Sequence, residues 1–198
     1  MRLLSVALIL ILGVNLGCQK GEEDPVFSLV TRKSRIAGTW TVTKAESVNG
    51  VISQSYDGTT LTSTIDDTIS AVYALEWEMS IDRQGGYTIT YVANVPEDTV
   101  FNRAEYTETT EETGNWEFTG GNNSPSKSKL LLLLTERKIT RSDQGTNVNV
   151  VTYDEAREGE VYDIVGLSSE DMKLSYSEIR SFGGGQDISS QTMELKKN

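Results

Sequence analysis

The chain of 198 residues contains no histidine and one cysteine, and it carries 18 basic residues against 29 acidic ones. Without histidine, and with the one cysteine thiol expected to carry lipid, the usual nucleophile and base pairs of enzymes are missing, and zinc lacks its preferred ligands. A lone cysteine forms no internal disulfide, so no cross-linked framework is expected. The acidic excess repels polyanions, which argues against nucleic acid as a partner. We therefore expect neither an enzyme nor a metal or cofactor site.

Residues 1–17, MRLLSVALILILGVNLG, have the features of a secretory signal peptide. Arg2 supplies a positive start, and a mostly apolar stretch follows from Leu3 to Val14. That stretch is too short to cross a hydrocarbon core of about 30 Å as a helix, but it fits the apolar region of a signal. A short buried helix is the alternative, and the basic N-terminal flank favours the signal.

The cysteine directly follows this segment. Leu16-Gly17-Cys18 resembles the lipobox of bacterial lipoproteins, although Asn15 stands where that pattern has leucine. The resemblance implies that the Cys18 thiol receives a diacylglycerol and that the cysteine becomes the new N-terminus. The acyl chains would anchor the protein to a membrane, because each buried methylene contributes about 0.8 kcal/mol.

Residues 18–24 would then be the lipidated cysteine and an acidic tether, QKGEED. The tether resembles the export signal that Bacteroidetes place after a lipidated cysteine, which implies an outer-membrane protein on the cell surface. A plain solvated linker is the alternative, and it would leave the protein on the periplasmic face. Residues 25–198 are of a size for one well-cored domain.

The first part of that domain predicts one short helix. Asp24 can cap it, Pro25 suits its first position, and Gly38 can end it. From there the apolar period changes to two, which is typical of antiparallel strands with one dry face. Alternating segments are 38–43, 76–81, 86–92, 114–120, 171–179 and 192–197.

Turn chemistry separates these segments. Arg83–Tyr87 and Glu111–Gly114 both predict connections between strands. Leu130–Leu134 does not alternate, so it is either a strand covered on both faces or a short helix, and its turn-rich flanks favour the strand. We expect an all-β fold, an up-and-down antiparallel barrel of eight to ten strands with a short N-terminal helix. A two-sheet sandwich is the alternative.

Gly38-Thr39-Trp40 after a short helix resembles the start of the lipocalin fold. More closely, residues 25–197 resemble the lipocalin-like domains of Bacteroidetes lipoproteins. The resemblance implies that Trp40 closes the base of the barrel and that Gly38 permits the tight turn from helix to strand. It also implies an arginine over the tryptophan, for which Arg157 and Arg180 are candidates that spacing does not separate.

The inward faces of the expected strands are rich in aromatic residues with phenol groups. The candidate lining is Trp77, Met79, Tyr87, Tyr91, Trp116, Phe118, Met172 and Tyr176. These side chains either surround a pocket for a small apolar ligand or fill the barrel as core. A filled barrel would serve as a structural or interaction module for an envelope protein partner. Glu76 and Glu78 share the opposite face, which we expect to be the solvated exterior.

Overall fold

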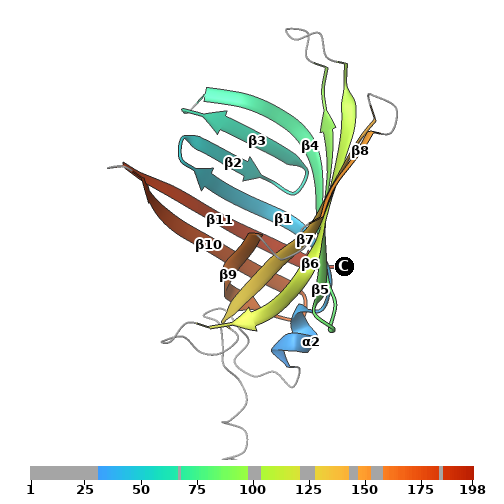
Figure 1. The fold of residues 1–198 in the computed structure, drawn as a ribbon, viewed down its shortest axis with the longest axis vertical. Helices are drawn as coiled ribbons and strands as arrows, with labels where there is room; N and C mark the ends of the chain where they lie inside the picture. Colours follow the sequence, from blue (N-terminus) through green and yellow to red (C-terminus); the bar gives the residue numbers. More distant parts are fainter. Residues whose placement is uncertain are drawn as a thin grey trace, which may run out of the picture.

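The computed structural model describes residues 31–66, 68–97, 104–120, 128–142, 147–152, 158–182 and 185–198, and these form an antiparallel β-barrel (Figure 1). The expected signal peptide, Cys18 with its tether, and Arg157 lie outside the described residues. So does the expected helix start at Asp24 and Pro25.

One short helix, α2 (Arg32–Ile36), stands before the first strand. The strands are β1 (Gly38–Asn49), β2 (Ile52–Tyr56), β3 (Thr60–Ile65), β4 (Thr68–Ile81), β5 (Gly86–Val95), β6 (Tyr106–Thr119), β7 (Lys129–Arg141), β8 (Asn147–Thr152), β9 (Glu158–Leu167), β10 (Asp171–Phe182) and β11 (Gly185–Lys197).

The strands form a closed ring. Neighbours in it are β6, β5, β4, β3, β2, β1, β11, β10, β9 and β7, and β7 returns to β6. β8 pairs with the second half of β7, and β9 pairs with its first half. The sequence-based expectation of a barrel with a short N-terminal helix is confirmed, and the two-sheet sandwich is wrong.

The ring changes size along the barrel axis. At the end beside α2, which we call the base, β1 pairs directly with β4 through Gly38–Thr41 and Glu78–Ile81. The ring there consists of β1, β4, β5, β6, β7, β9, β10 and β11. Towards the other end, the mouth, β2 and β3 separate β1 from β4. Because barrel diameter grows with strand number, the mouth half encloses more space than the base half.

The β2–β3 hairpin acts as a wedge whose tip is held tightly. Asp57 Oδ1 accepts hydrogen bonds from the backbone N–H groups of Thr59 and Thr60 at 2.9 and 2.8 Å. Gly58 has a φ of +99°, and a Cβ there would lie 2.9 Å from the carbonyl oxygen of Thr43. A glycine is therefore needed at this tip. The neighbouring β1 has a register shift between Val42 and Lys44, which bends it around the wedge.

The helix α2 covers the base, as Figure 1 shows. Thr31 caps it by accepting a hydrogen bond from the Ser34 N–H at 3.2 Å. Its Arg32, Arg35 and Ile36 are buried. The Arg35 guanidinium donates to the Leu167 carbonyl at the end of β9. This ties the helix to the far side of the ring.

Trp40 lies directly behind the helix, and it is fully buried. Its indole Nε1–H donates to the Ile36 carbonyl at 2.7 Å, which satisfies one of the carbonyls at the helix end. Gly38, between helix and strand, has a φ of +140°, and a Cβ on it would lie 2.3 Å from Lys197 Cε. Gly38 thus forms the turn from the helix into β1, and Trp40 lies at the base next to the helix.

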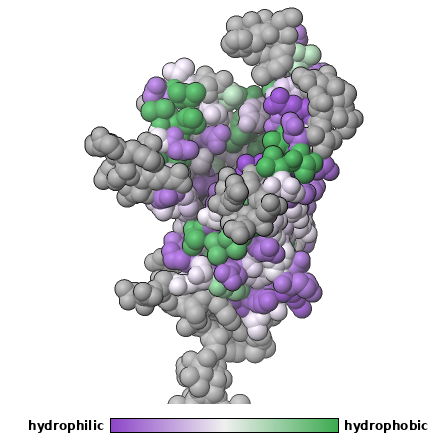
Figure 2. Space-filling view, in the orientation of Figure 1, coloured by the Kyte–Doolittle hydropathy of each residue, from purple (hydrophilic) through white to green (hydrophobic). Residues whose placement is uncertain are grey.

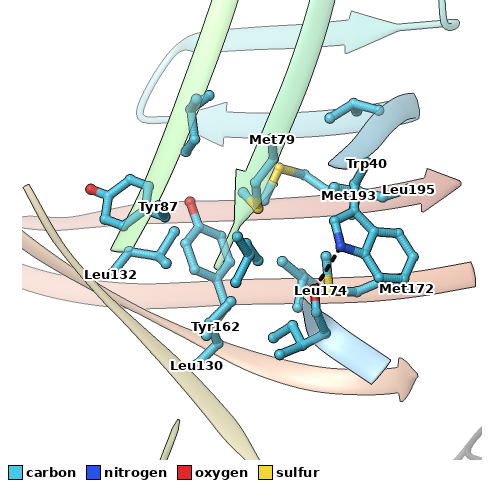
Figure 3. Packing of buried hydrophobic residues seen from close by; sticks show 14 of the residues in the cluster. Trp40, Met79, Tyr87, Leu130, Leu132, Tyr162, Met172, Leu174, Met193 and Leu195 are labelled. Atoms are coloured by element: carbon cyan, nitrogen blue, oxygen red, sulfur yellow. Dashed lines mark hydrogen bonds between the residues drawn. The ribbon is translucent and has the colours of Figure 1, made fainter. Parts of the chain in front are cut away.

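Side chains fill the base half of the barrel. Figure 3 shows Trp40 at one end of this packing, the hydroxyl groups of Tyr87 and Tyr162 at the other, and Met79 and Met193 between them. Fully burying an aliphatic or thioether side chain contributes about 1.5–3 kcal/mol. The residues that are almost inaccessible to solvent here are Trp40, Val42, Met79, Leu130, Met172, Leu174, Met193 and Leu195. The interior of this half is therefore hydrophobic core.

Two local expectations have different outcomes. Leu130–Leu134 lies within β7, with Leu130, Leu132 and Leu134 buried, so the strand reading is confirmed. Glu111–Gly114 is no turn, because it lies in the middle of β6. Glycine at position 114 lets neighbouring atoms approach the backbone closely. A Cβ there would lie 2.1 Å from the Leu133 carbonyl oxygen and 2.7 Å from Tyr87 Cε1.

The exterior is mixed in polarity. Figure 2 shows apolar residues of the visible face in separate clusters among polar ones. Glu76 and Glu78 are exposed on the outer face of β4, as the alternation predicts. Large apolar side chains that remain exposed are Val48, Val51, Ile52, Ile65, Val72, Val150, Val151, Val161 and Ile188.

Candidate ligand site in the mouth half of the barrel

A cavity of about 290 Å³, here called cavity A, lies where the β2–β3 wedge widens the ring. The volume is just below the range of small-molecule sites, about 300–1,000 Å³. Its apolar lining comes from Ala45, Tyr56, Leu61, Tyr73, Leu75, Trp77, Tyr91 and Ala93, and its polar lining from Ser47, Gln54, Glu108, Thr110 and Gln191. Its position follows from the insertion of two strands that the base lacks.

Three aromatic rings form a continuous wall of cavity A. The Tyr56 and Trp77 rings have centroids 5.9 Å apart, and those of Trp77 and Tyr91 are 5.1 Å apart. The Tyr56 hydroxyl donates to the Leu75 carbonyl at 3.0 Å, which fixes the ring at the tip of the wedge. Such spacings are those of favourable aromatic pairs. The wall is therefore preformed.

A second cavity of about 200 Å³, cavity B, adjoins the first. Trp77, Tyr91 and Gln191 line both. The rest of its lining is Tyr87, Ile89, Glu112, Leu132, Leu134, Arg137, Glu160, Tyr162 and Met193. Cavity B thus places charged groups beside the aromatic wall.

The charged groups of cavity B are held by defined partners. Arg137 Nε donates to Glu112 Oε1 at 2.7 Å across the β6–β7 pair. The Tyr162 hydroxyl donates to Glu160 Oε2 at 2.5 Å, and Gln191 Oε1 lies 3.0 Å from the same hydroxyl. Glu108, which lines cavity A, similarly accepts a hydrogen bond at Oε2 from Arg141 Nε. Polar groups are therefore presented in fixed positions along one side of the mouth half.

These surroundings act on the phenols of the lining. Burial raises the pKa of Tyr87 and Tyr91 above the usual phenol value, and the nearby carboxylates of Glu112 and Glu160 raise it further. Burial also raises the pKa of Tyr162, with Glu160 adding to the effect. All three phenols are consequently neutral hydrogen-bonding groups at neutral pH.

Of the predicted lining residues, Trp77, Tyr87 and Tyr91 line cavity A or cavity B. Met79 and Met172 are buried in the packed base. Trp116 is buried too, and its indole N–H donates to the Asp82 carbonyl at 2.8 Å. Phe118 packs edge-on against Trp116 with centroids 5.3 Å apart. None of these four residues lines cavity A or cavity B, and they belong to the hydrophobic core or pack against it.

The last predicted lining residue, Tyr176, lies on the wall near the mouth. It is half-buried, its ring centroid is 5.9 Å from that of Tyr162, and its hydroxyl donates to Glu178. It borders neither cavity A nor cavity B. Tyr176 instead packs against the edge of the hydrophobic core.

Sequence reasoning missed most of the polar lining. Glu112 was assigned to a turn, and Arg137, Glu160 and Gln191 were not considered. The wedge residues Gln54, Tyr56 and Leu61 were missed because residues 52–65 were not recognised as strands. The signal for Tyr56 was present: an aromatic residue directly precedes Asp57-Gly58, a pair typical of a hairpin turn.

The base has an amine where the lipocalin resemblance implies a guanidinium. Lys197 Nζ lies 4.9 Å from the centroid of the Trp40 ring. In the β10–β11 register Arg180 stands opposite Asp187, towards the mouth end of β10, whereas Met172 of the same strand belongs to the base. The other candidate, Arg157, lies outside the described residues.

Of the helices that the structure describes, none has the length and apolar character needed to cross a membrane. Across the same residues, acidic and cysteine side chains form no group of three or more that could hold a metal ion. No family model, curated protein or solved structure matches the chain.

Proposed function

We propose that the protein is a binding module that holds a small, largely apolar ligand in the mouth half of its barrel. The observation that carries the proposal is cavity A, with its wall of Tyr56, Trp77 and Tyr91. The packed base supports it as well, because a rigid closed end preorganises the walls of the open one. A preformed aromatic wall favours binding over a purely structural role.

Ligand binding is tested by filling the cavity. Ala93 lines cavity A, and Ala74 on the adjacent strand is exposed on the outer face. Ala93→Phe should abolish binding of a small apolar probe without loss of folding, whereas Ala74→Phe should leave binding unchanged. Native mass spectrometry of the domain purified from its own membrane identifies a retained ligand. A domain that carries no small molecule and binds no apolar probe would refute the proposal.

We further propose that the module is displayed on a membrane surface through lipid on Cys18. The support is the signal-like segment 1–17 and the acidic tether after the cysteine. Cys18→Ala should move the protein from the membrane fraction to the soluble fraction. Protease treatment of intact cells then distinguishes the cell surface from the periplasmic face, since only a surface protein is degraded. Unchanged membrane attachment of the variant would contradict the anchor.

The alternative is an interaction module for an envelope protein. In that case, Ala93→Phe would have no effect on function, and a stoichiometric protein partner would co-purify with a ligand-free barrel. The same native mass spectra decide between the two, because they report small molecules and protein partners together. The binding proposal also implies no reaction: Glu112 and Glu160 are engaged by Arg137 and Tyr162, an arrangement that suits holding a ligand.

A further inference from the structure

The charges around the two cavities do not balance. Glu108 and Glu112 are each paired with an arginine, Arg141 and Arg137. Glu160 has the neutral hydroxyl of Tyr162 as its partner, and no cation among the described residues forms an ion pair with it. Among the described residues, Glu160, which is exposed at the edge of cavity B, therefore has no cationic partner.

The aromatic groups of cavity B, like the carboxylate of Glu160, favour a ligand with positive charge. Trp77, Tyr87, Tyr91 and Tyr162 line it. Aromatic faces attract cations, and the attraction grows when the cation leaves water. The buried phenols also show that negative charge is disfavoured here, since burial and the carboxylates together raise the pKa of Tyr91. An anionic ligand would meet the same field.

Cavity A has a different character. Its walls include Leu61, Leu75 and Ala93 besides the aromatic rings, so it suits an apolar body. Trp77, Tyr91 and Gln191 are common to both cavities, so one ligand can extend from one into the other. An apolar cavity that continues into an acidic, aromatic one is complementary to an amphiphile.

We propose that the ligand is a cationic amphiphile, with an amine-type head group in cavity B beside Glu160 and its apolar body in cavity A. This inference rests on the proposed binding function and specifies its ligand class. Glu160 supplies the counter-charge, and Trp77 and Tyr91 supply aromatic faces to the head group. Specificity arises because an anionic head group of the same size would be repelled.

The test compares three probes with one alkyl chain: decylamine, decanol and decanoate, each kept as monomers at neutral pH. Tryptophan fluorescence of the full domain reports binding through Trp77, and calorimetry gives the dissociation constants. We expect decylamine to bind about tenfold tighter than decanol, as one desolvated cation contact provides, and decanoate to bind weakest. Equal binding of amine and alcohol, or tighter binding of decanoate, would overturn the cationic assignment while leaving the binding function standing. If none of the three binds, the binding function itself fails.

Variants at the two charges should act in opposite directions. Glu160→Gln should reduce decylamine affinity to about that of decanol, and Arg137→Gln should increase it by exposing the Glu112 carboxylate to the ligand. Glu76→Gln, on the outer face of β4, is the control and should leave all three affinities unchanged. Glu160→Gln and Arg137→Gln each test the cationic assignment separately, so if one variant misfolds, the other still decides. Unaltered amine selectivity in a folded Glu160→Gln or Arg137→Gln protein would refute the proposal.

Discussion

Lys197 Nζ lies 4.9 Å above the centroid of the Trp40 ring and donates a hydrogen bond to the Arg35 carbonyl at 2.9 Å. The last strand thus closes on the first strand and on the helix through one side chain. Trp40 and Lys197 are also opposite each other in the β1–β11 register. Ring closure, helix docking and burial of the tryptophan therefore depend on a common contact.

Replacing this lysine should destabilise the whole barrel. Lys197→Met keeps the length of the side chain but removes the cation and the donor, and we expect a loss of about 1–2 kcal/mol in the free energy of unfolding. Lys196→Met changes the neighbouring side chain, which is exposed, and should have little effect. Urea unfolding curves of the two variants provide the comparison. Similar midpoints for both would show that the cation contributes nothing at the base.

The β4–β5 hairpin offers a pH-dependent test. Asp82 Oδ1 accepts hydrogen bonds from the N–H groups of Gln84, Gly85 and Gly86 at 2.7, 2.8 and 2.9 Å. These bonds, that of Gly86 most of all, lower the pKa of Asp82 in the folded state. Its contribution to stability is therefore present above the unfolded pKa, about 3.9, and is lost as the pH falls through the folded value.

Asp82→Ala should accordingly lower the thermal midpoint at neutral pH and have a smaller effect in strong acid. The measurement is the difference in midpoint between the wild type and the variant at several pH values, which cancels effects common to both proteins. Asp57→Ala should behave in parallel, because the pKa of Asp57 is lowered by the same kind of hydrogen bonds from Thr59 and Thr60. A difference that does not change with pH would contradict the role assigned to the carboxylate.

The base of the barrel could be predicted from the sequence, and the mouth could not. Near Trp40 and Met79 one face of each strand is apolar and the other polar, so the period of two is clear. Around the cavities both faces carry polar side chains. Residues 60–65, for example, read TLTSTI and form the half-buried strand β3. Apolar and polar side chains do not alternate clearly there. The β2–β3 hairpin, which creates the cavity, is therefore hard to recognise as two strands from its sequence.

Glu112 illustrates the same limit. Two glutamates followed by Thr113 and Gly114 are typical of a turn. They belong instead to a strand whose interior face is polar at this point. The β6–β7 register shifts between Thr113 and Gly114, and the buried leucines of β7 give way to Arg137 beyond that point. A single sequence does not reveal that a cavity replaces the core at that height. The sequence shows each acidic and aromatic residue by itself. Which of them meet around the cavities is decided by the strand pairing of the barrel.

The buried phenols predict loss of stability in alkali. Burial, followed by the carboxylates of Glu112 and Glu160, raises the pKa of Tyr91 in the folded protein. An unfolded tyrosine ionises near pH 10, so stability is fully present below about pH 10 and is lost as the pH rises above it. Phenolate absorbance should rise together with the loss of far-ultraviolet circular dichroism. Tyr91→Phe should shift this transition to higher pH, whereas complete ionisation of all eight tyrosines in a folded barrel would contradict the burial.

The ion pair between Glu112 and Arg137 should be energetically coupled more strongly than an ion pair on the surface. The two side chains are 18% and 35% exposed, and they face cavity B. Removing one partner takes from the other, which is partly buried, the opposite charge that this pair supplies, and this costs more than removing both. We therefore expect Glu112→Gln and Arg137→Gln each to destabilise the protein, and the double variant to lose less than the two together.

A double-mutant cycle of urea unfolding measures this coupling, for which we expect about 1–2 kcal/mol. The control cycle uses Lys173 and Glu194, whose charged atoms are 3.7 Å apart and whose side chains are 39% and 52% exposed. Coupling there should be close to zero, because water screens exposed pairs. Equal coupling in the two cycles would mean that the interior of the mouth half is as well solvated as the outer surface. In that case its carboxylates would no longer discriminate among ligand charges, since solvent would screen them before a head group arrived.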